Sequence, residues 1–292
     1  MGLKVLVLGS TGLIGHQVFN YLIKTEKYEL SNIAYRKKLN HETILCDVRN
    51  QDKFIEIVKS LSPDVIINCI GILIKGANLD PENAIFLNAY FPHRLMSLAD
   101  ELKSKLIHIS TDCVFSGAKE MSYIEKDFKD GKDTYAKSKG LGEIMNKNHL
   151  TLRTSVVGPE LKRDGEELFH WFMSQTGEVN GFTKAIWSGV TTLILAKVVD
   201  WAIEHEITGL YHVTNNNSID KYSLLCLIKK YTKKNISIIP VEDKKPNKSF
   251  IDTRNELDFI IPSYEVMIRK MIDMMLQNKE IYEQYKLNSA RK

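Results

Sequence analysis

Short apolar segments rich in β-branched residues alternate with helix-like segments through the first half of this 292-residue chain. The predicted strands are Lys4–Leu8, Ile33–Tyr35, Thr43–Cys46, Val65–Cys69, Leu106–Ile109 and Leu150–Arg153. The predicted helices are Leu13–Lys24, Asp52–Leu61, Pro81–Lys103 and Tyr135–Asn148. Apolar strands separated by helices indicate a parallel sheet covered on both faces. The sequence therefore predicts an α/β fold built on a doubly wound parallel sheet.

The second half of the chain is less regular. Its predicted helices are Glu166–Ser174, Leu193–His205, Tyr222–Tyr231 and Tyr264–Leu276, and its predicted strands are Gly209–Val213 and Ile236–Pro240. The chain carries no internal repeat and no low-complexity linker. We therefore expect a Rossmann-type domain followed by a smaller α/β C-terminal lobe.

A glycine-rich turn follows the first predicted strand and opens the first predicted helix. Its residues are Gly9, Ser10, Thr11, Gly12, Leu13, Ile14 and Gly15. The N-terminus of a helix offers free N–H groups and a partial positive charge, which together stabilise a pyrophosphate. Glycines allow the tight turn, a close approach of the backbone to the ligand, and close packing of helix on strand. The turn therefore predicts dinucleotide binding through these residues.

The end of the second predicted strand bears on the choice of nicotinamide cofactor. An NAD site usually places an acidic residue here to accept the ribose hydroxyls, yet no Asp or Glu lies between Glu29 and Glu42. Arg36, with Lys37 beside it, would instead pair with a 2′-phosphate. This pattern favours NADP(H), although a solvated basic loop has the same composition.

Candidate catalytic residues follow the fifth predicted strand. Tyr135 and Lys139 are four residues apart, so they share one face of a helix. A tyrosine has a pKa of about 10, and a nearby ammonium group would lower it. Tyr135 would protonate a carbonyl oxygen, Lys139 would hold the phenol in a reactive state and contact the nicotinamide ribose, and Thr111 would orient the carbonyl.

The spacing of these motifs resembles the extended short-chain dehydrogenase/reductase family, and within it the dTDP-4-dehydrorhamnose reductase-like proteins. The resemblance rests on Gly9–Gly15, Ser110–Gly117, Tyr123–Asp127, Tyr135–Lys139, Gly142–Glu143 and Leu152–Ser155. A later segment, from Lys245 to Thr253, is similar to a loop that lies near the substrate in that family. The resemblance is strong over the first 160 residues or so and patchy afterwards.

The resemblance implies further cofactor-binding residues. Asp47 and Val48 match the position beside the adenine, and Cys69, Ile70 and Gly71 match an element after the fourth strand. Asn88 matches a helix residue that supports the site, and Ser110 precedes the catalytic threonine. On this basis residues 1–158, together with 187–215, are expected to form the NADP-binding domain. Residues 159–186 and 216–292 are expected to form the substrate-binding lobe.

The resemblance also implies the reaction, which is NADPH-dependent reduction of the 4-keto group of a dTDP- or UDP-linked 6-deoxyhexulose. The expected substrate-binding residues are Asp112, Cys113, Val114, Phe182, Trp187, Lys245 and Lys248. Related 4,6-dehydratases carry a glutamate where this chain has Cys113. A thiol replaces a carboxylate poorly in water elimination, so a dehydratase is disfavoured.

Two other functions remain open from the sequence. A sugar-nucleotide epimerase needs only the threonine, tyrosine and lysine with a retained NAD, and the basic cofactor segment argues against it. Some proteins of this fold are non-catalytic NADP-binding regulatory subunits, against which the complete Thr111, Tyr135 and Lys139 set argues. Proteins of the family are often dimeric, so a homodimer is compatible with the resemblance.

Composition excludes several other classes of partner. The formal net charge of +4 is too small to indicate nucleic acid binding, and no apolar run reaches the roughly 18 residues of a membrane helix. Four cysteines without CxxC spacing and eight histidines without a ligand pair indicate no metal site. Free cysteines are typical of a reducing compartment, so the expected location is the cytoplasm.

Overall fold

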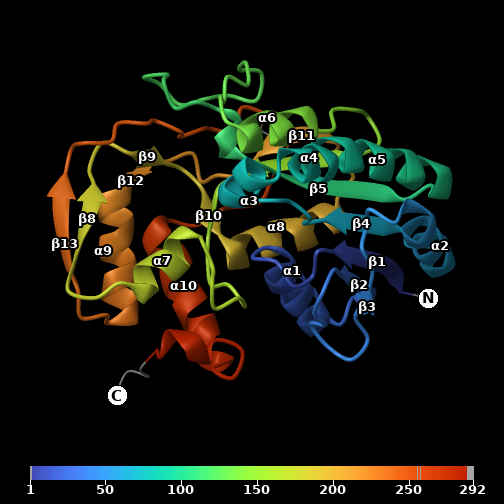
Figure 1. The fold of residues 1–292 in the computed structure, drawn as a ribbon, viewed down its shortest axis with the longest axis horizontal. Helices are drawn as coiled ribbons and strands as arrows, with labels where there is room; N and C mark the ends of the chain where they lie inside the picture. Colours follow the sequence, from blue (N-terminus) through green and yellow to red (C-terminus); the bar gives the residue numbers. More distant parts are fainter. Residues whose placement is uncertain (1, 255, 257, 288–292) are drawn as a thin grey trace.

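A seven-stranded parallel sheet forms the centre of the computed structural model, which describes residues 2–254, 256 and 258–287. Its strand order is β11-β6-β5-β4-β1-β2-β3. The strands are β1 (Leu3–Leu8), β2 (Tyr28–Ala34), β3 (Ile44–Leu45), β4 (Val65–Asn68), β5 (Lys105–Thr111), β6 (Leu150–Thr154) and β11 (Gly209–His212). Every neighbouring pair is parallel, which confirms the predicted Rossmann-type sheet (Figure 1).

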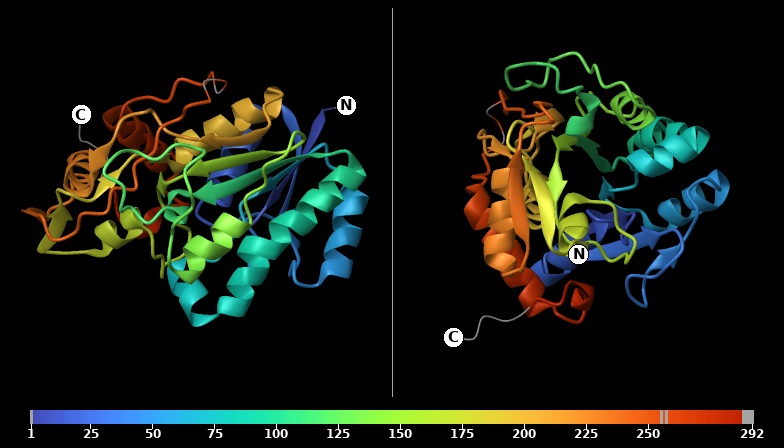
Figure 2. Two further views of the ribbon diagram at one scale, coloured as in Figure 1. Left: turned by 90° about the horizontal axis from the view of Figure 1, so that it is seen from above. Right: turned by 60° about the vertical axis from the view of Figure 1, so that its left-hand side comes forward.

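Helices cover both faces of this sheet (Figure 2). Val5 and Val7 of β1 belong to the core beneath α1 (Gly15–Leu22) and α8 (Thr192–Glu204). The alternating Leu6 and Leu8 belong to the opposite core, beneath α2 (Gln51–Leu61) and α5 (Phe91–Leu102). Because side chains alternate along a strand, an unbroken apolar strand such as β1 supplies both cores.

The helices on the side of α5 form a connected layer. They are α3 (Ile74–Leu79), α4 (Pro81–Ala84), a π-helical turn (Ile85–Tyr90), α5 and α6 (Thr134–Leu141). The predicted helix Pro81–Lys103 is thus present as three consecutive helical segments, and α3 was not predicted. No helix in the described ranges is both long and apolar enough to cross a membrane.

The C-terminal residues build a smaller α/β lobe beside the sheet (Figure 1). It contains the parallel pair β8 (Glu178–Phe182) and β13 (Ser237–Val241), with α7 (Leu168–Ser174), α9 (Lys221–Thr232) and α10 (Tyr264–Gln277). Two short strand pairs join the lobe to the sheet region: β7 (Val156–Val157) with β10 (Val190–Thr191), and β9 (Ile186–Trp187) with β12 (Ile219–Asp220).

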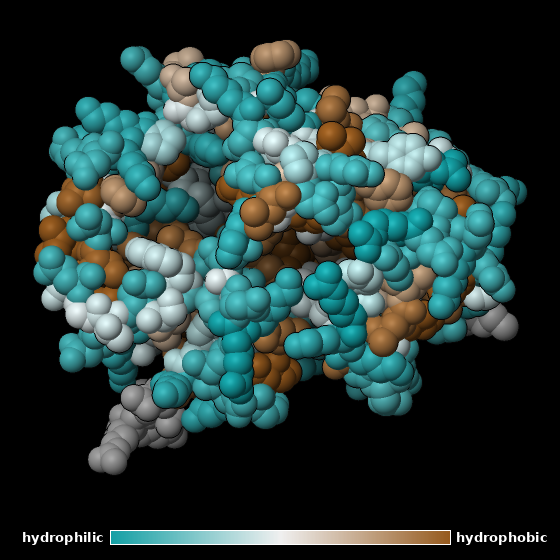
Figure 3. Space-filling view, in the orientation of Figure 1, coloured by the Kyte–Doolittle hydropathy of each residue, from teal (hydrophilic) through white to brown (hydrophobic). Residues whose placement is uncertain are grey.

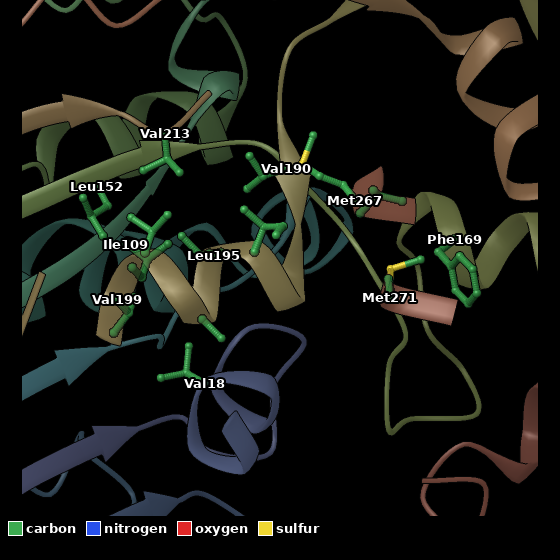
Figure 4. Close-up of a cluster of buried hydrophobic side chains, with 14 of the residues drawn as sticks. Val18, Ile109, Leu152, Phe169, Val190, Leu195, Val199, Val213, Met267 and Met271 are labelled. Carbon is green, nitrogen blue, oxygen red and sulfur yellow. The ribbon is translucent and has the colours of Figure 1, made fainter. Parts of the chain in front are cut away.

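One apolar core runs from the sheet into the lobe (Figure 4). Val18 of α1 and Leu195 of α8 belong to the same cluster as Met271 of α10 and Phe169 of α7. The methionines of α10 therefore serve as packing residues, as their flexible side chains suit. Burial of this shared surface holds the lobe against the central sheet.

Two predicted boundaries were wrong. Strand β2 begins at Tyr28, five residues before the predicted start at Ile33, because its first half pairs with β1 while its side chains are only partly buried. Helix α6 ends at Leu141, well before the predicted end at Asn148. Gly142 caps the helix, and a Cβ atom there would lie 1.9 Å from the carbonyl oxygen of Asn88.

Substitution of Gly142 tests this close contact between α6 and the π-helical turn. Gly142→Ala is expected to lower the free energy of unfolding by at least about 2 kcal/mol, because the new methyl group meets backbone that has no room to move. Gly140→Ala is the matched control, since its Cβ would have no neighbour closer than 3.5 Å. Denaturant unfolding measures both, and equal effects of the two substitutions would contradict the assignment.

Candidate active site

A cavity of about 630 Å³ opens at the carboxyl ends of the central strands, between the sheet and the lobe. Figure 3 shows that this face of the molecule is hollowed near its centre. The predicted site residues that line the cavity are Thr11, Gly12, Leu13, Ile14, Arg36, Cys69, Ile70, Gly71, Ser110, Thr111, Asp112, Cys113, Tyr135 and Lys139. The predicted residues outside its lining are Gly9, Ser10, Gly15, Lys37, Asp47, Val48, Asn88, Val114, Phe182, Trp187, Lys245 and Lys248.

The glycine turn is tightly folded against the start of α1. Gly9 has a φ of +76°, a value that favours glycine, and a Cβ at Gly15 would lie 2.1 Å from the carbonyl oxygen of Gly9. Among the described residues, no hydrogen bond engages the backbone N–H groups of Thr11, Leu13 or Ile14. These three residues line the cavity, so their N–H groups are available to an anionic ligand.

Ser10 supports the turn from behind. Its side chain is fully buried, and its hydroxyl donates to Oδ1 of Asn32 at 2.7 Å. Asn32 lies in β2, directly before the predicted start of that strand at Ile33. Its side chain is also buried. The side chain of Ser10 therefore ties the turn to the neighbouring strand, and only its backbone remains for a ligand.

Two arginines flank the aromatic ring of Tyr35 at the end of β2. The guanidinium carbon of Arg36 lies 4.7 Å from the ring centroid, and that of Arg49 lies 5.4 Å from it. Arg49 donates to both carboxylate oxygens of Asp47, with Nη2 to Oδ2 at 2.7 Å, which lowers the pKa of Asp47. Arg36 makes no ion pair in the described part of the chain and lines the cavity, whereas Lys37 is exposed.

Asn88 joins the loop after β4 to helix α6. Its Oδ1 accepts from the backbone N–H of Ile72 at 2.9 Å, and its Nδ2 donates to the carbonyl of Ile72 and to Oγ of Ser138. A Cβ at Gly71 would lie 3.3 Å from this Oδ1. Asn88 thus shapes one wall of the cavity without lining it.

The three predicted catalytic side chains converge on the cavity from β5 and α6. Asp133 begins α6 by accepting from the N–H of Ala136 at 2.8 Å, which places Tyr135 and Lys139 on the face toward the sheet. Nζ of Lys139 donates to the carbonyl oxygen of Ile109 at 2.7 Å. Oγ1 of Thr111 donates to Oδ1 of Asp112 at 3.2 Å.

The protonation of Tyr135 and Lys139 is governed mainly by their burial. Burial raises the pKa of Tyr135 well above its usual value, and Cys113 adds to this effect while Thr111 opposes it. Burial lowers the pKa of Lys139 to about 8, against the opposing charge of Glu143.

A buried ion pair joins β6 to the chain that follows α6. Arg153 of β6 donates to both carboxylate oxygens of Glu143 at 2.7 Å, and Oγ of Ser110 donates to the same carboxylate at 2.7 Å. The side chains of Glu143 and Arg153 are 0% and 1% exposed, so the pair is desolvated. The pair fixes β5 to β6 and holds the chain that follows α6.

The predicted substrate residues are only partly brought together. Asp112 and Cys113 line the cavity, but Val114 is buried in a separate apolar cluster with Phe115. Trp187 is buried, and its Nε1 donates to Oγ of Ser155, which does line the cavity, at 2.7 Å. Phe182 lies beneath the Lys244 ammonium at 4.7 Å, outside the lining.

Sequence reasoning missed one wall of the cavity. Its residues are Ile72, Leu73, Ile74 and Gly76 from the segment around α3, Thr154, Ser155 and Val156 after β6, and Glu160, Leu161, Lys162, Glu166 and Glu167 before α7. The position of these segments directly after β4 and β6 was an available signal, since ligands bind at the carboxyl ends of parallel strands.

The strand order, the glycine turn and the Thr111, Tyr135 and Lys139 cluster on one cavity define an extended short-chain dehydrogenase/reductase fold. The family described as RmlD substrate binding domain matches residues 3–276, and the chain belongs to this family.

The chain is similar along most of its length to named reductases. It is 23% identical to dTDP-4-dehydrorhamnose reductase of Escherichia coli over 307 residues, which covers 96% of this chain and 100% of the relative. It is 29% identical to the reductase of that name from Aggregatibacter actinomycetemcomitans over 237 residues, which covers 77% and 78% of the two chains. The solved structure of dTDP-4-dehydrorhamnose reductase from Bacillus anthracis in complex with NADP has a TM-score of 0.80 at 22% identity, covering 93% of this chain and 99% of the other.

Removal of the charge of Glu143 tests the buried ion pair. Glu143→Gln is expected to lower the free energy of unfolding by about 3–5 kcal/mol, because the guanidinium of Arg153 is left buried with no opposite charge. Lys59→Gln is a control, since its pair with Glu101 lies at the surface and should contribute less than about 1 kcal/mol. Denaturant unfolding compares the two, and a Glu143→Gln protein as stable as the wild type would contradict this account.

Proposed function

We propose that this protein uses NADPH to reduce the 4-keto group of a nucleotide-diphospho-6-deoxyhexulose, as a dTDP-4-dehydrorhamnose reductase-like enzyme. The observation that carries the proposal is the position of Thr111, Tyr135 and Lys139 on the same cavity as the glycine turn. The names of its relatives and the NADP held by a structure of the same fold support it.

The residues of the turn fit a dinucleotide. Gly9 and Gly15 leave space that any Cβ would fill, and the N–H groups of Thr11, Leu13 and Ile14 are directed to no protein partner in the described chain. These groups would hold the pyrophosphate, and Arg36, with Lys37 nearby, would hold the 2′-phosphate. Lys139 would hydrogen-bond the nicotinamide ribose. When bound, the cofactor supplies the hydride.

The protein's own groups supply the proton. A buried phenol with a raised pKa is fully protonated at neutral pH, which is the form needed to protonate a carbonyl oxygen as it gains negative charge. The hydroxyl of Thr111 would donate a second hydrogen bond to this oxygen.

We further propose that one part of the chain binds the cofactor and another part binds the nucleotide sugar. Residues 1–158 with 187–215 would bind the cofactor, a reading supported by the place of β11 in the central sheet. Residues 159–186 and 216–292 would bind the nucleotide sugar. This is supported by five residues of the first range that line the cavity, namely Glu160, Leu161, Lys162, Glu166 and Glu167. Lys245 and Lys248 would contact the diphosphate.

NADPH and nucleotide sugars are cytoplasmic metabolites, so the cytoplasm is the proposed location.

Substitution of Tyr135 tests the reductase activity. NADPH oxidation is followed with dTDP- and UDP-linked 4-keto-6-deoxyhexoses, and Tyr135→Phe is expected to lower the rate by about 10²–10⁴-fold because the proton donor is lost. Tyr90→Phe is a control at a half-exposed tyrosine outside the cavity. Tight NADPH binding with no turnover on any keto sugar would instead support a regulatory subunit.

Substitution of Arg36 tests the cofactor preference. Arg36→Ala is expected to weaken NADPH binding about 10–100-fold, since a charge-assisted hydrogen bond is worth about 1.5–3 kcal/mol, and to leave NADH binding unchanged. Lys38→Ala is the control, because its ammonium contacts only the carbonyl of His41 in the described structure. Fluorescence titration with each cofactor gives both constants. Equal losses for NADPH and NADH would refute a role for Arg36 at the 2′-phosphate.

A further inference from the structure

A carboxyl group that the proposed reduction does not use lines the cavity. Glu167 is the residue that immediately precedes α7, and it lines the cavity together with Tyr135. Its backbone is fixed on both sides. The N–H donates to Oε1 of Glu160 at 2.9 Å, and the carbonyl oxygen accepts from the N–H of Trp171 at 2.8 Å. No hydrogen bond or ion pair within the described ranges engages its carboxylate.

A thiol occupies the wall on the sheet side of the same cavity. Cys113 lies in a 3₁₀ turn (Asp112–Val114) directly after β5, and its N–H donates to Oγ1 of Thr111 at 3.2 Å. Burial raises the pKa of Cys113 to about 12, and Asp112 adds to the effect. The thiol is therefore protonated at neutral pH and can act as a proton donor.

The surroundings of Glu167 bring the pKa of its carboxyl group close to neutral pH. Burial raises its pKa to about 7, the nearby carboxylates of Glu160, Asp112 and Glu166 act in the same direction, and Lys221 opposes them. Both Glu167 and Cys113 are close enough to Tyr135 to raise the pKa of its phenol, after burial. An acid–base group with a pKa near the working pH is an efficient one.

We propose that Glu167 and Cys113 form a proton-transfer pair that inverts a carbon next to the keto group of the sugar before the keto group is reduced. This inference rests on the proposed function, because it requires a keto sugar in the cavity. It adds an epimerase step to the reductase. The two groups come from different segments of the same cavity lining, Glu167 from the segment before α7 and Cys113 from the turn after β5.

The step balances without any redox partner. The carboxylate of Glu167 removes the proton from the carbon beside the carbonyl, the C–H electron pair forms a C=C bond, and the carbonyl π pair moves to oxygen. Thr111 and Tyr135 stabilise that oxygen by donating hydrogen bonds. The enolate then collapses, and the carbon takes the thiol proton of Cys113 on its other face. Proton exchange with water returns Glu167 to the carboxylate and Cys113 to the thiol.

The experiment measures hydrogen exchange in the absence of NADPH. Wild-type protein is incubated in D₂O with a dTDP-linked 4-keto-6-deoxyhexose, and loss of the proton signals beside the carbonyl is followed by ¹H NMR. We expect exchange at least 10-fold faster than in the protein-free solution. Glu167→Gln is expected to lower the rate about 10²-fold or more. Cys113→Ala is expected to keep exchange and to lose formation of the inverted sugar.

Controls separate loss of the proton-transfer group from loss of folding. Asp164→Asn removes an exposed carboxylate from the same segment, outside the cavity lining, and should exchange like the wild type. NADPH titration and a thermal melt show whether Glu167→Gln is folded. Exchange by folded Glu167→Gln at the wild-type rate would overturn the proposal.

The same preparations separate this inference from the proposed function. Wild-type protein that reduces the keto sugar with NADPH but shows no exchange above the protein-free rate overturns the epimerase step alone. Exchange that depends on Glu167 without any NADPH oxidation supports the proton-transfer pair and overturns the reductase. Absence of both activities overturns both.

Discussion

The parallel alignment of β1, β4, β5 and β6 is the constraint on which the site depends. Parallel strands end at the same edge of the sheet, so the loops that follow them meet there. The glycine turn, the segment around Gly71, the Thr111 turn and the segment before α7 all start at this edge. Chemistry that is spread over more than 150 residues of sequence therefore surrounds a single cavity.

Much of this arrangement could be predicted from the sequence, because the hydrophobic pattern of the strands and the residue types that follow them indicate the same fold. The apolar run of β1 and the glycines after it are locally determined, since only glycine fits at Gly9 and Gly15. The Tyr135 and Lys139 pair follows from helical spacing. Strand β8 was missed because its short sequence, Glu178–Phe182, contains a glycine and two polar residues and is stabilised by pairing with the distant β13.

The protonation states could not be predicted in the same way, because they depend on burial by distant segments. Lys139 is predicted to favour the phenolate of Tyr135, and the structure adds a hydrogen bond from its ammonium to the carbonyl of Ile109 on β5. Glu167 gave no sequence signal, since an acidic residue before a helix is usually a solvated first-turn residue. Its pKa is raised first by burial in the folded chain, and the nearby carboxylates of Glu160 and Asp112 add to the effect.

The pKa values of the catalytic groups also indicate how cofactor binding would be coupled to proton transfer. With a pKa near 8, Lys139 holds its proton at neutral pH by a small margin. Phosphates bound at the glycine turn and at Arg36 would add negative charge to the cavity, and negative charge stabilises an ammonium. By linkage, cofactor binding would then strengthen as the pH falls through the pKa of Lys139, since the protonated form binds more tightly. Lys139, which we propose to contact the ribose, would thereby hold its charge most firmly when a cofactor is present.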